Sequence, residues 1–310
     1  RAQQRGNLRP RRFHQLALRG AGRRRVIVSA IEHLSVLQAA DGIETVPVTA
    51  AGIVDTAQLA EMLAADDEPA LVSIMLANNE TGVIQPLDEI AQIVEGAGGL
   101  LHSDMVQAAG RLPLDRHAVA MATLSAHKIG GPQGVGALVL GRAGPVSPII
   151  RGGGQERGRR AGTENVAGIV GFGVAARMLR EGGDGNAAMA QMRDRMESRL
   201  RQEFPDAVIF GADAPRLANT SCVAIPGMRA ETQIMALDLA GIAVSAGSAC
   251  SSGKVATSHV LQAMGAADDL AQCAIRVSYG PGNTDADSDM LIETLRTLRG
   301  RTVRQKTEAA

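Results

Sequence analysis

Short apolar runs alternate with amphipathic stretches from Val26 onward, and this alternation restricts the possible fold more than any other feature. The runs cover residues 26–30, 45–48, 70–76, 100–104, 120–125 and 137–140. Most are continuously hydrophobic, as strands are when helices cover both faces of a sheet. Between them lie helices with recognisable starts, such as Asp55 with Gln58 as a capping box and the stretch after Pro86. The pattern predicts an α/β fold with a mostly parallel sheet.

A glycine-rich break at 182–185 separates this region from a second one. Met189, Met192, Met196 and Leu200 then recur at helical spacing, which is typical of a helix packed in a core rather than of a cofactor site. Further strands are expected at 208–210, 219–225, 242–245 and 275–279, and a last helix at 285–299. We predict an incomplete large domain over 26–184 and a smaller α+β C-terminal domain over 185–310.

Composition narrows the class of partner. The chain has 310 residues, is 45% hydrophobic and 21% charged, and carries no formal net charge. Aromatic residues make up 2%, which argues against a nucleic-acid surface built from basic and stacking side chains. No apolar run approaches the length that spans a membrane, and three scattered cysteines favour a reducing compartment. We expect a cytoplasmic protein that acts on small molecules.

The first 25 residues differ from the rest of the chain. They hold nine arginines, no acidic residue and no sustained apolar period. Two interpretations are open: an arginine-rich targeting segment, and a truncated or frame-shifted start. We predict no fold, and hence disorder, for this segment.

Polar side chains follow four of the predicted strands. In open α/β sheets ligands bind beyond the carboxyl ends of the strands, so this edge is the expected site. Any one of these residues alone is commonly a helix cap, but together they converge on one edge. They are Glu32 and His33, then Asn78, Asn79 and Glu80, then Asp104 and Gln107, and finally Ser125, His127 and Lys128.

Lys128 is one of three lysines among 32 basic residues, and it lies between an apolar strand and a glycine-rich segment. A poorly hydrated amine has its charged form disfavoured, so it can attack an aldehyde near neutral pH. Such a lysine is typical of enzymes that use pyridoxal phosphate, which also need an acid at the pyridinium nitrogen and donors for the phosphate.

Seven strings place these residues in a wider pattern. They are EHLSVL, VSIMLANNETGVIQP, HSDMVQAAGRLPLD, SAHKIGGPQGVGAL, RGGGQERGRRAGTENV, SAGSACSSG and IRVSYG. In order and spacing they resemble the cysteine desulfurases of the class V aminotransferase family, in particular the NifS and IscS group. The resemblance runs from about Leu16 to about Arg301 and implies a pyridoxal-phosphate-dependent transferase of fold type I.

The resemblance also implies a role for each residue of the site. Lys128 would hold pyridoxal 5'-phosphate covalently, and Asp104 would face its ring nitrogen. His33 would stack on the ring and move protons, a task that suits imidazole. The remaining matches are Asn79 and Gln107 for the ring oxygen, Ser125 and His127 for the phosphate, Thr163 for the phosphate of the other subunit in a homodimer, and Arg276 for the substrate carboxylate.

Cys250 is the residue that would decide the chemistry. It lies among serines and glycines, where we expect an exposed loop. Cys222 and Cys273 lie in or beside apolar strands, where we expect them to pack as small apolar side chains. By the resemblance, its thiolate takes sulfur from L-cysteine as a persulfide, releases L-alanine, and passes the sulfur to an acceptor protein. That acceptor would be an iron–sulfur scaffold or a tRNA-thiolation relay.

The chain departs from the family pattern at its start. The family has a Gly-Thr-Glu type turn whose amides bind the cofactor phosphate, and residues 7–15 bear no likeness to it. Two alternatives to an active cysteine desulfurase therefore stay open. One is a truncated, impaired homologue that retains a dimer or acceptor-binding surface, and the other is an enzyme resembling selenocysteine lyases.

Overall fold

The structure, a computed structural model, describes residues 11–114, 119–141, 146–181, 185–247 and 257–308. Two compact units make up the chain. Unit 1 comprises Arg1–Val48, Val54–Asn78 and Gln85–Gly183, and unit 2 comprises Thr49–Ile53, Asn79–Ile84 and Asp184–Ala310. Two short segments from the first half of the sequence, including Asn79, thus fold with the C-terminal unit, which the predicted boundary at 184/185 did not foresee.

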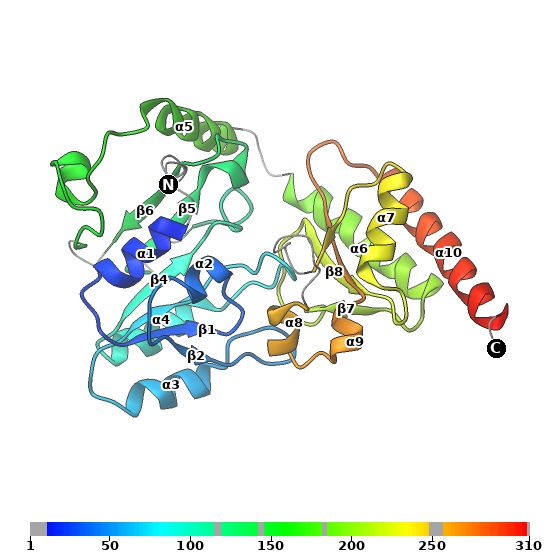
Figure 1. Cartoon of the computed structure of the whole chain (residues 1–310), viewed down its shortest axis with the longest axis horizontal. Helices are drawn as coiled ribbons and strands as arrows, with labels where there is room; N and C mark the ends of the chain where they lie inside the picture. Colours follow the sequence, from blue (N-terminus) through cyan, green and yellow to red (C-terminus); the bar gives the residue numbers. More distant parts are fainter. Residues whose placement is uncertain (1–10, 115–118, 142–145, 182–184, 248–256, 309–310) are drawn as a thin grey trace, which may run out of the picture. The chain divides into compact units, whose positions relative to one another are not determined.

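Unit 1 is built on one sheet of six strands, whose arrangement can be followed in Figure 1. Its strands lie in the order β2-β1-β3-β4-β5-β6. They are β1 (Val26–Ser29), β2 (Glu44–Val46), β3 (Leu71–Ser73), β4 (Leu100–Asp104), β5 (Met121–Ser125) and β6 (Gly136–Leu140). All neighbours pair in parallel except β6, which runs antiparallel to β5. The predicted α/β fold with a mostly parallel sheet is confirmed.

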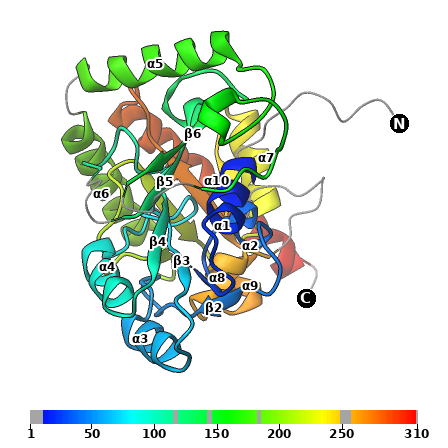
Figure 2. The ribbon, with the colours of Figure 1, turned by 90° about the vertical axis from the view of Figure 1, so that its left-hand side faces the viewer.

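Helices cover both faces of this sheet, as Figure 2 shows. On one face α3 (Thr56–Ala64) packs on α4 (Leu87–Gly96), and α4 packs on β4. On the other, α1 (Arg11–Gly20) packs on β4, β5 and β6 and on α2 (Leu34–Leu37). The last helix of the unit is α5 (Val166–Glu181), and two 3₁₀ turns, η1 (Ala126–Ile129) and η2 (Gln155–Gly158), lie in the connections. Double coverage explains why the strands read as unbroken apolar runs.

Capping follows the sequence signal at α3. The Asp55 carboxylate accepts a hydrogen bond from the Gln58 backbone N–H at 3.0 Å. The reciprocal half of the predicted capping box is replaced, because the Gln58 side chain donates to Glu61 instead. One orphan amide of the helix start is satisfied in this way.

The N-terminal segment differs from its prediction. Arg11–Gly20 form helix α1 rather than an unfolded stretch, and Ala17 and Leu18 are buried. The amide of Ser147 donates to the carbonyl of Gly20 and ties the end of the helix to the sheet region. The segment has too few apolar residues to show a period by itself, so its order depends on tertiary packing.

Unit 2 is a four-stranded antiparallel sheet with helices, in the strand order β7-β8-β10-β9. Its strands are β7 (Val208–Phe210), β8 (Thr220–Ala224), β9 (Ser245–Ala246) and β10 (Ala274–Ser278). Its helices are α6 (Asn186–Glu203), α7 (Ala230–Leu239), α8 (His259–Ala263), α9 (Asp268–Ala271) and α10 (Asp285–Glu308). Met192, Met196 and Leu200 of α6 lie in its core, as their spacing predicted. The strand expected at 242–245 is shorter and begins at Ser245.

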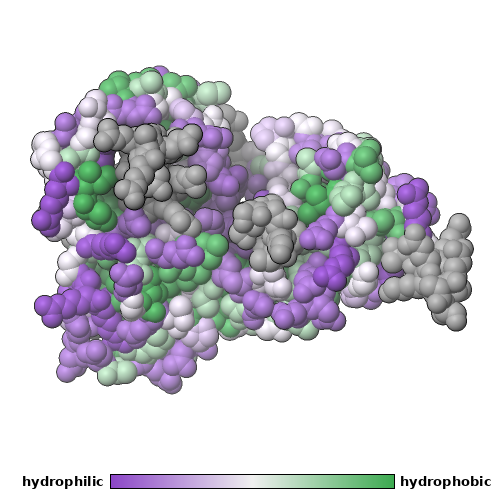
Figure 3. Space-filling view, in the orientation of Figure 1, coloured by the Kyte–Doolittle hydropathy of each residue, from purple (hydrophilic) through white to green (hydrophobic). Residues whose placement is uncertain are grey.

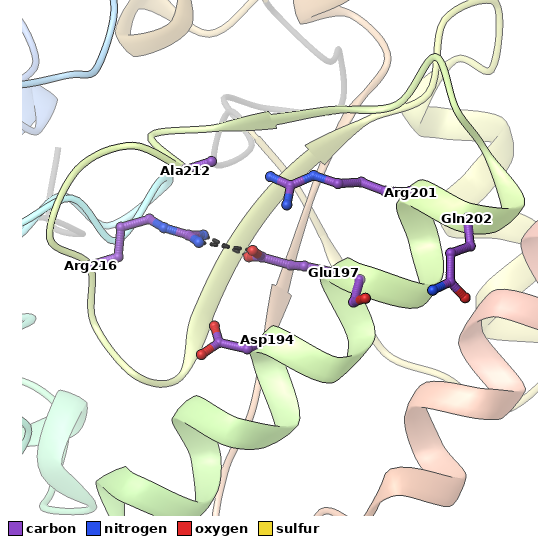
Figure 4. A pocket seen from close by; sticks show the side chains of 7 residues that line it. Asp194, Glu197, Arg201, Gln202, Ala212 and Arg216 are labelled. Carbon is purple, nitrogen blue, oxygen red and sulfur yellow. Dashed lines mark hydrogen bonds and ion pairs between the residues drawn. The ribbon is translucent and has the colours of Figure 1, made fainter.

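A buried ion pair joins α6 to the segment that leads into β8. Both guanidinium nitrogens of Arg216 donate to the carboxylate of Glu197, at 2.7 and 2.9 Å. The Ser221 hydroxyl donates to the same carboxylate at 2.7 Å, and both charged side chains are 6% exposed. Figure 4 shows the pair at the wall of a polar cavity of about 500 Å³. Neither charge can be removed alone without leaving the other buried and uncompensated.

We predict that Glu197→Gln lowers the free energy of unfolding by about 3 kcal/mol, because Arg216 keeps a buried charge without its counterion. The matched control is Arg195→Gln on the same helix, since Arg195 pairs with Asp285 at the surface with both side chains more than half exposed. That change should cost less than about 1 kcal/mol. Urea unfolding of the three proteins measures the difference, and equal losses in the two variants would contradict the argument.

Candidate active site

The parallel ladder brings four of the predicted residues of unit 1 to one edge of the sheet. Asp104 is the last residue of β4 and pairs with Thr123 of the neighbouring strand β5. Ser125 ends β5, and η1 then carries His127 and Lys128. Because β4 and β5 are parallel, their carboxyl ends open to the same side. These four residues therefore lie at the carboxyl edge of two neighbouring strands, and their roles stay predictions.

Asp104 is held by two contacts at a nearly buried position, since the residue is 8% exposed. One carboxylate oxygen, Oδ1, accepts the backbone N–H of Val106 at 2.9 Å. The other, Oδ2, lies 3.3 Å from Nε2 of His14. Two partners from different elements fix the plane of this carboxylate.

Three titratable groups near Asp104 are driven to their uncharged forms. Burial lowers the pKa of His14, although the charge of Asp104 acts in the opposite direction. Burial, reinforced by the neighbouring His14, lowers the pKa of His102 well below its usual range. Burial and then the charge of Asp104 raise the pKa of Glu32 well above its usual range, against hydrogen bonds from Met75 N–H and Ser29. Desolvation therefore favours the uncharged forms of the groups around this carboxylate.

Ser125 and His127 are paired with each other. The Ser125 hydroxyl lies 2.7 Å from Nδ1 of His127, so a hydroxyl and an imidazole are presented together. Burial lowers the pKa of His127, and the positive charge of Lys128 lowers it further.

Lys128 differs from its expected setting. Its side chain is exposed, whereas the sequence suggested a poorly hydrated amine. The reason is local: η1 turns the chain away from the strand directly after the buried Ser125 and Ala126. Strand β5 and the first residue of the turn are buried, but the Lys128 side chain lies on the exposed side of that turn.

The other predicted residues of unit 1 have local contacts of their own. His33 caps the start of α2, where its Nδ1 accepts the Ser35 N–H at 3.2 Å, and its side chain is exposed. Gln107 is half-buried, and its carbonyl accepts a hydrogen bond from Arg111. Thr163 is exposed in the segment before α5.

Asn79 and Arg276 meet within unit 2. The Arg276 guanidinium donates from Nη1 to the Asn79 carbonyl at 2.9 Å and from Nη2 to the Ser245 hydroxyl at 3.2 Å. Arg276 lies on β10 opposite Ser245 of β9. These bonds hold the guanidinium in one orientation at a half-buried position, which suits recognition of a planar carboxylate.

Glu80, which follows Asn79 after the predicted strand, lies in this second cluster as well. Its carboxylate accepts the Ser258 hydroxyl at 2.5 Å, and Ser258 also caps α8 by accepting the Leu261 N–H. Burial raises the pKa of Glu80 to about 7, against the bond from Ser258 and the charge of Arg276. Glu80 therefore titrates near neutrality beside the guanidinium.

The cysteines divide as predicted where the structure describes them. Cys222 and Cys273 are buried, and burial raises the pKa of the Cys222 thiol, which makes it a poor nucleophile. Cys250 lies outside the described residues. Within the described ranges no group of three potential ligand side chains could hold a metal ion, and no helix there is both long and apolar enough to cross a membrane.

Comparison with known proteins places these features in a family. Residues 14–291 match the family Aminotransferase class-V. A cysteine desulfurase of Cereibacter sphaeroides is 44% identical over 283 residues, which cover 88% of this chain and 72% of that protein. The cysteine desulfurase NifS of Azotobacter vinelandii is 39% identical over 280 residues, covering 87% and 69%. The chain belongs to the class-V aminotransferase family, in its cysteine desulfurase branch.

Solved structures agree with the sequence relatives. A NifS-like protein from Rickettsia africae superimposes with a TM-score of 0.85 at 34% identity, and the match covers 94% of this chain and 80% of that one. The predicted fold, a pyridoxal-phosphate-dependent transferase of fold type I, is thereby confirmed.

The residues of unit 1 fit pyridoxal phosphate by their donor set. Lys128 offers an amine for the aldehyde, Asp104 a nearly buried carboxylate for a cationic ring nitrogen, and Ser125 with His127 a hydroxyl and an imidazole for a phosphate. The paired orientation of Ser125 and His127 and the fixed plane of Asp104 are the observations that support this fit. Preorganised donors of this kind are what such cofactors require.

Sequence reasoning missed His14 and Ser258. His14 lies in the arginine-rich segment that seemed unstructured, and only tertiary packing brings it to Asp104. Ser258 follows the predicted catalytic loop, and its signal was a helix cap three residues before the amide of Leu261.

We predict that Glu80 makes the protein less stable as pH rises. Its folded pKa of about 7 exceeds the ordinary value of 4.5, so the folded state binds more protons between these values and stability falls through that window. The free energy of unfolding should drop by about 2 kcal/mol from pH 5 to pH 8 relative to Glu80→Gln. The control is Glu231→Gln at an exposed site, which should keep the wild-type slope. Urea unfolding across this range gives the result, and parallel pH profiles of wild type and Glu80→Gln would refute it.

Proposed function

We propose that this chain is a pyridoxal-phosphate-dependent cysteine desulfurase that converts L-cysteine to L-alanine. The observation that carries the proposal is the placement of Asp104 and of Ser125, His127 and Lys128 at the adjacent carboxyl ends of β4 and β5. Family membership supports the same reaction, because relatives at 39–44% identity are named cysteine desulfurases. No observation favours a selenocysteine-specific enzyme or an inactive homologue.

Each residue of unit 1 then has a task. The Lys128 amine holds the cofactor aldehyde, Asp104 accepts from its ring nitrogen, and Ser125 and His127 bind its phosphate. His33 and Gln107 lie beyond β1 and β4 at the same carboxyl edge, where we assign His33 to proton transfer over the ring and Gln107 to the ring oxygen. When bound, the cofactor supplies an electron sink for the substrate.

Unit 2 supplies the recognition of the amino acid. Arg276 is fixed by Asn79 and Ser245, and a fixed guanidinium fork binds a carboxylate through two parallel hydrogen bonds. We assign Arg276 to the substrate carboxylate and the Asn79 side chain to the ring oxygen of the cofactor.

The sulfur step belongs to Cys250. Its thiolate attacks the sulfur of the bound cysteine, a sulfur–sulfur bond forms, and the carbon–sulfur bond of the substrate breaks. The electron pair of that bond stays on carbon and takes up a proton, so alanine leaves and Cys250 carries a persulfide. The persulfide then passes to an acceptor protein for iron–sulfur cluster or thio-cofactor synthesis, in the cytoplasm.

A homodimer completes the proposal, and α5 offers a surface for it. Val166, Val170, Val174 and Met178 form one row at intervals of four residues, with between 48% and 66% of each exposed. Figure 3 shows hydrophobic residues gathered along the upper edge of the molecule, where Figure 1 places α5. A row of this kind is typical of a subunit contact, and Thr163, which we assign to the partner's phosphate site, lies just before the same helix.

We predict that the wild-type chain takes up pyridoxal phosphate and releases alanine and sulfide from cysteine in the presence of a thiol reductant. Borohydride should fix the cofactor on Lys128 and on neither of the other two lysines, as peptide mass spectrometry would show. Lys128→Ala should lose cofactor fixation and activity together.

Cys250→Ala separates the sulfur step from cofactor binding. It should bind the cofactor as the wild type does but lose sulfide release by at least about 100-fold, because Cys222 and Cys273, the thiols that the structure describes, are both buried. Cys273→Ala is the matched control and should retain activity. Full activity in Cys250→Ala, or fixation of the cofactor on another lysine, would refute the proposal.

For the dimer, we predict that Val170→Glu produces a monomer, since a charge in the centre of an apolar contact is costly to desolvate. Ala60→Glu on the exposed side of α3 is the control and should stay dimeric. Sedimentation equilibrium reports the mass, and a dimeric Val170→Glu would remove α5 from the interface.

A further inference from the structure

His14 has no role in the chemistry assigned above, yet it is almost completely buried against the predicted cofactor site. It is 1% exposed, and α1 carries it to the carboxyl end of β4. Its Nε2 lies 3.3 Å from Oδ2 of Asp104. A buried histidine without a hydrogen-bond partner would lower the stability of the fold, because burying a polar group is unfavourable unless it is hydrogen-bonded.

The neighbouring imidazole cannot replace it. Both ring nitrogens of His102 are engaged, Nδ1 with the Ser73 hydroxyl at 2.8 Å and Nε2 with the Thr123 hydroxyl at 2.7 Å. The rings of His102 and His14 meet edge to face, with centroids 5.8 Å apart. His102 therefore fixes the position of the His14 ring but has no nitrogen left for Asp104.

A neutral His14 can donate a hydrogen bond to Asp104 without adding a positive charge beside it. Burial lowers its pKa, so the ring is neutral at neutral pH, and only the tautomer with hydrogen on Nε2 can donate to Asp104. Nδ1 is then an acceptor, and it has no hydrogen-bond partner within the described residues. A charged imidazolium here would compete with a cationic ring nitrogen for the same carboxylate, whereas a neutral N–H orients the carboxylate and leaves its charge available.

We propose that His14 is a positioning residue which, through Nε2–H, holds the Asp104 carboxylate in the orientation that receives the ring nitrogen of pyridoxal phosphate. The inference rests on the proposed function, because it assigns a residue to that cofactor. It also gives the N-terminal helix a function, since α1 is the element that delivers this donor. Outer residues that orient a ligand-binding side chain commonly change affinity by 10–100-fold when lost.

The test compares His14→Leu, which removes the donor at similar volume, with His14→Gln, which keeps an N–H. Pyridoxal phosphate is titrated into each apoprotein, and visible absorbance gives the Kd and the pH midpoint of the bound cofactor. We expect His14→Leu to raise Kd about tenfold and to shift the pH midpoint, and His14→Gln to restore both to within about threefold of the wild-type Kd. Glu32, His102 and Asp104 are the titratable groups near His14, and all three are unchanged in these variants.

Two controls separate positioning from packing. Leu18→Ala, at an equally buried position of α1, should lower the melting temperature without raising Kd at temperatures where the protein is folded. In the Asp104→Asn background, His14→Leu should cause no further rise in Kd, because the two residues act through one contact. Additive effects in that pair, or a wild-type Kd and pH midpoint in His14→Leu, would overturn the inference while leaving the proposed function intact. Failure of the wild type to take up the cofactor would overturn both.

Discussion

The parallel pairing of β1, β3, β4 and β5 is the constraint on which the rest of unit 1 depends. Parallel strands point their carboxyl ends to one edge, and the register that pairs Asp104 with Thr123 sets the height of Ser125 and of η1 relative to the carboxylate. β6 returns antiparallel from Gly136, opposite Ser125, so the connection that holds His127 and Lys128 is confined to this edge. Polar groups that are far apart in the sequence, such as Asp104 and His127, are therefore brought to one edge of the sheet.

Much of this arrangement could be read from the sequence, because covered strands and helix caps leave local signals. The six strands of the large sheet were located to within a few residues, and the cap at Asp55 formed as its spacing indicated. The features that the sequence did not predict depend on tertiary contacts. The order of α1 comes from packing on β4, β5 and β6, and the membership of Asn79–Ile84 in unit 2 comes from pairing such as that of Val83 with Arg216, which no local pattern encodes.

The site itself shows the same division. Residue types and their order indicated which side chains would carry the chemistry, since a lysine, a carboxylate and a serine–histidine pair at strand ends are a recognisable set. The solvent exposure of these side chains was not predictable from residue type and order. Lys128 is exposed because a 3₁₀ turn follows the strand. An apolar run predicts that the strand is buried, but it does not predict the direction of the turn that follows.

Charge around Asp104 connects the fold to the proposed chemistry. Three buried groups near it, His14, His102 and Glu32, have their pKa values moved by desolvation toward the neutral form. A charged imidazolium near Asp104 would compete with a cationic ring nitrogen for the carboxylate. A second ionised carboxylate would repel Asp104 and raise its pKa. Burial favours the uncharged forms of these neighbours, which leaves Asp104 as the carboxylate suited to that nitrogen. Burial of His14, His102 and Glu32 therefore has an electrostatic consequence at Asp104. Desolvation of these polar groups is unfavourable for folding, but it also leaves the Asp104 carboxylate as the main charge at the position proposed for the ring nitrogen.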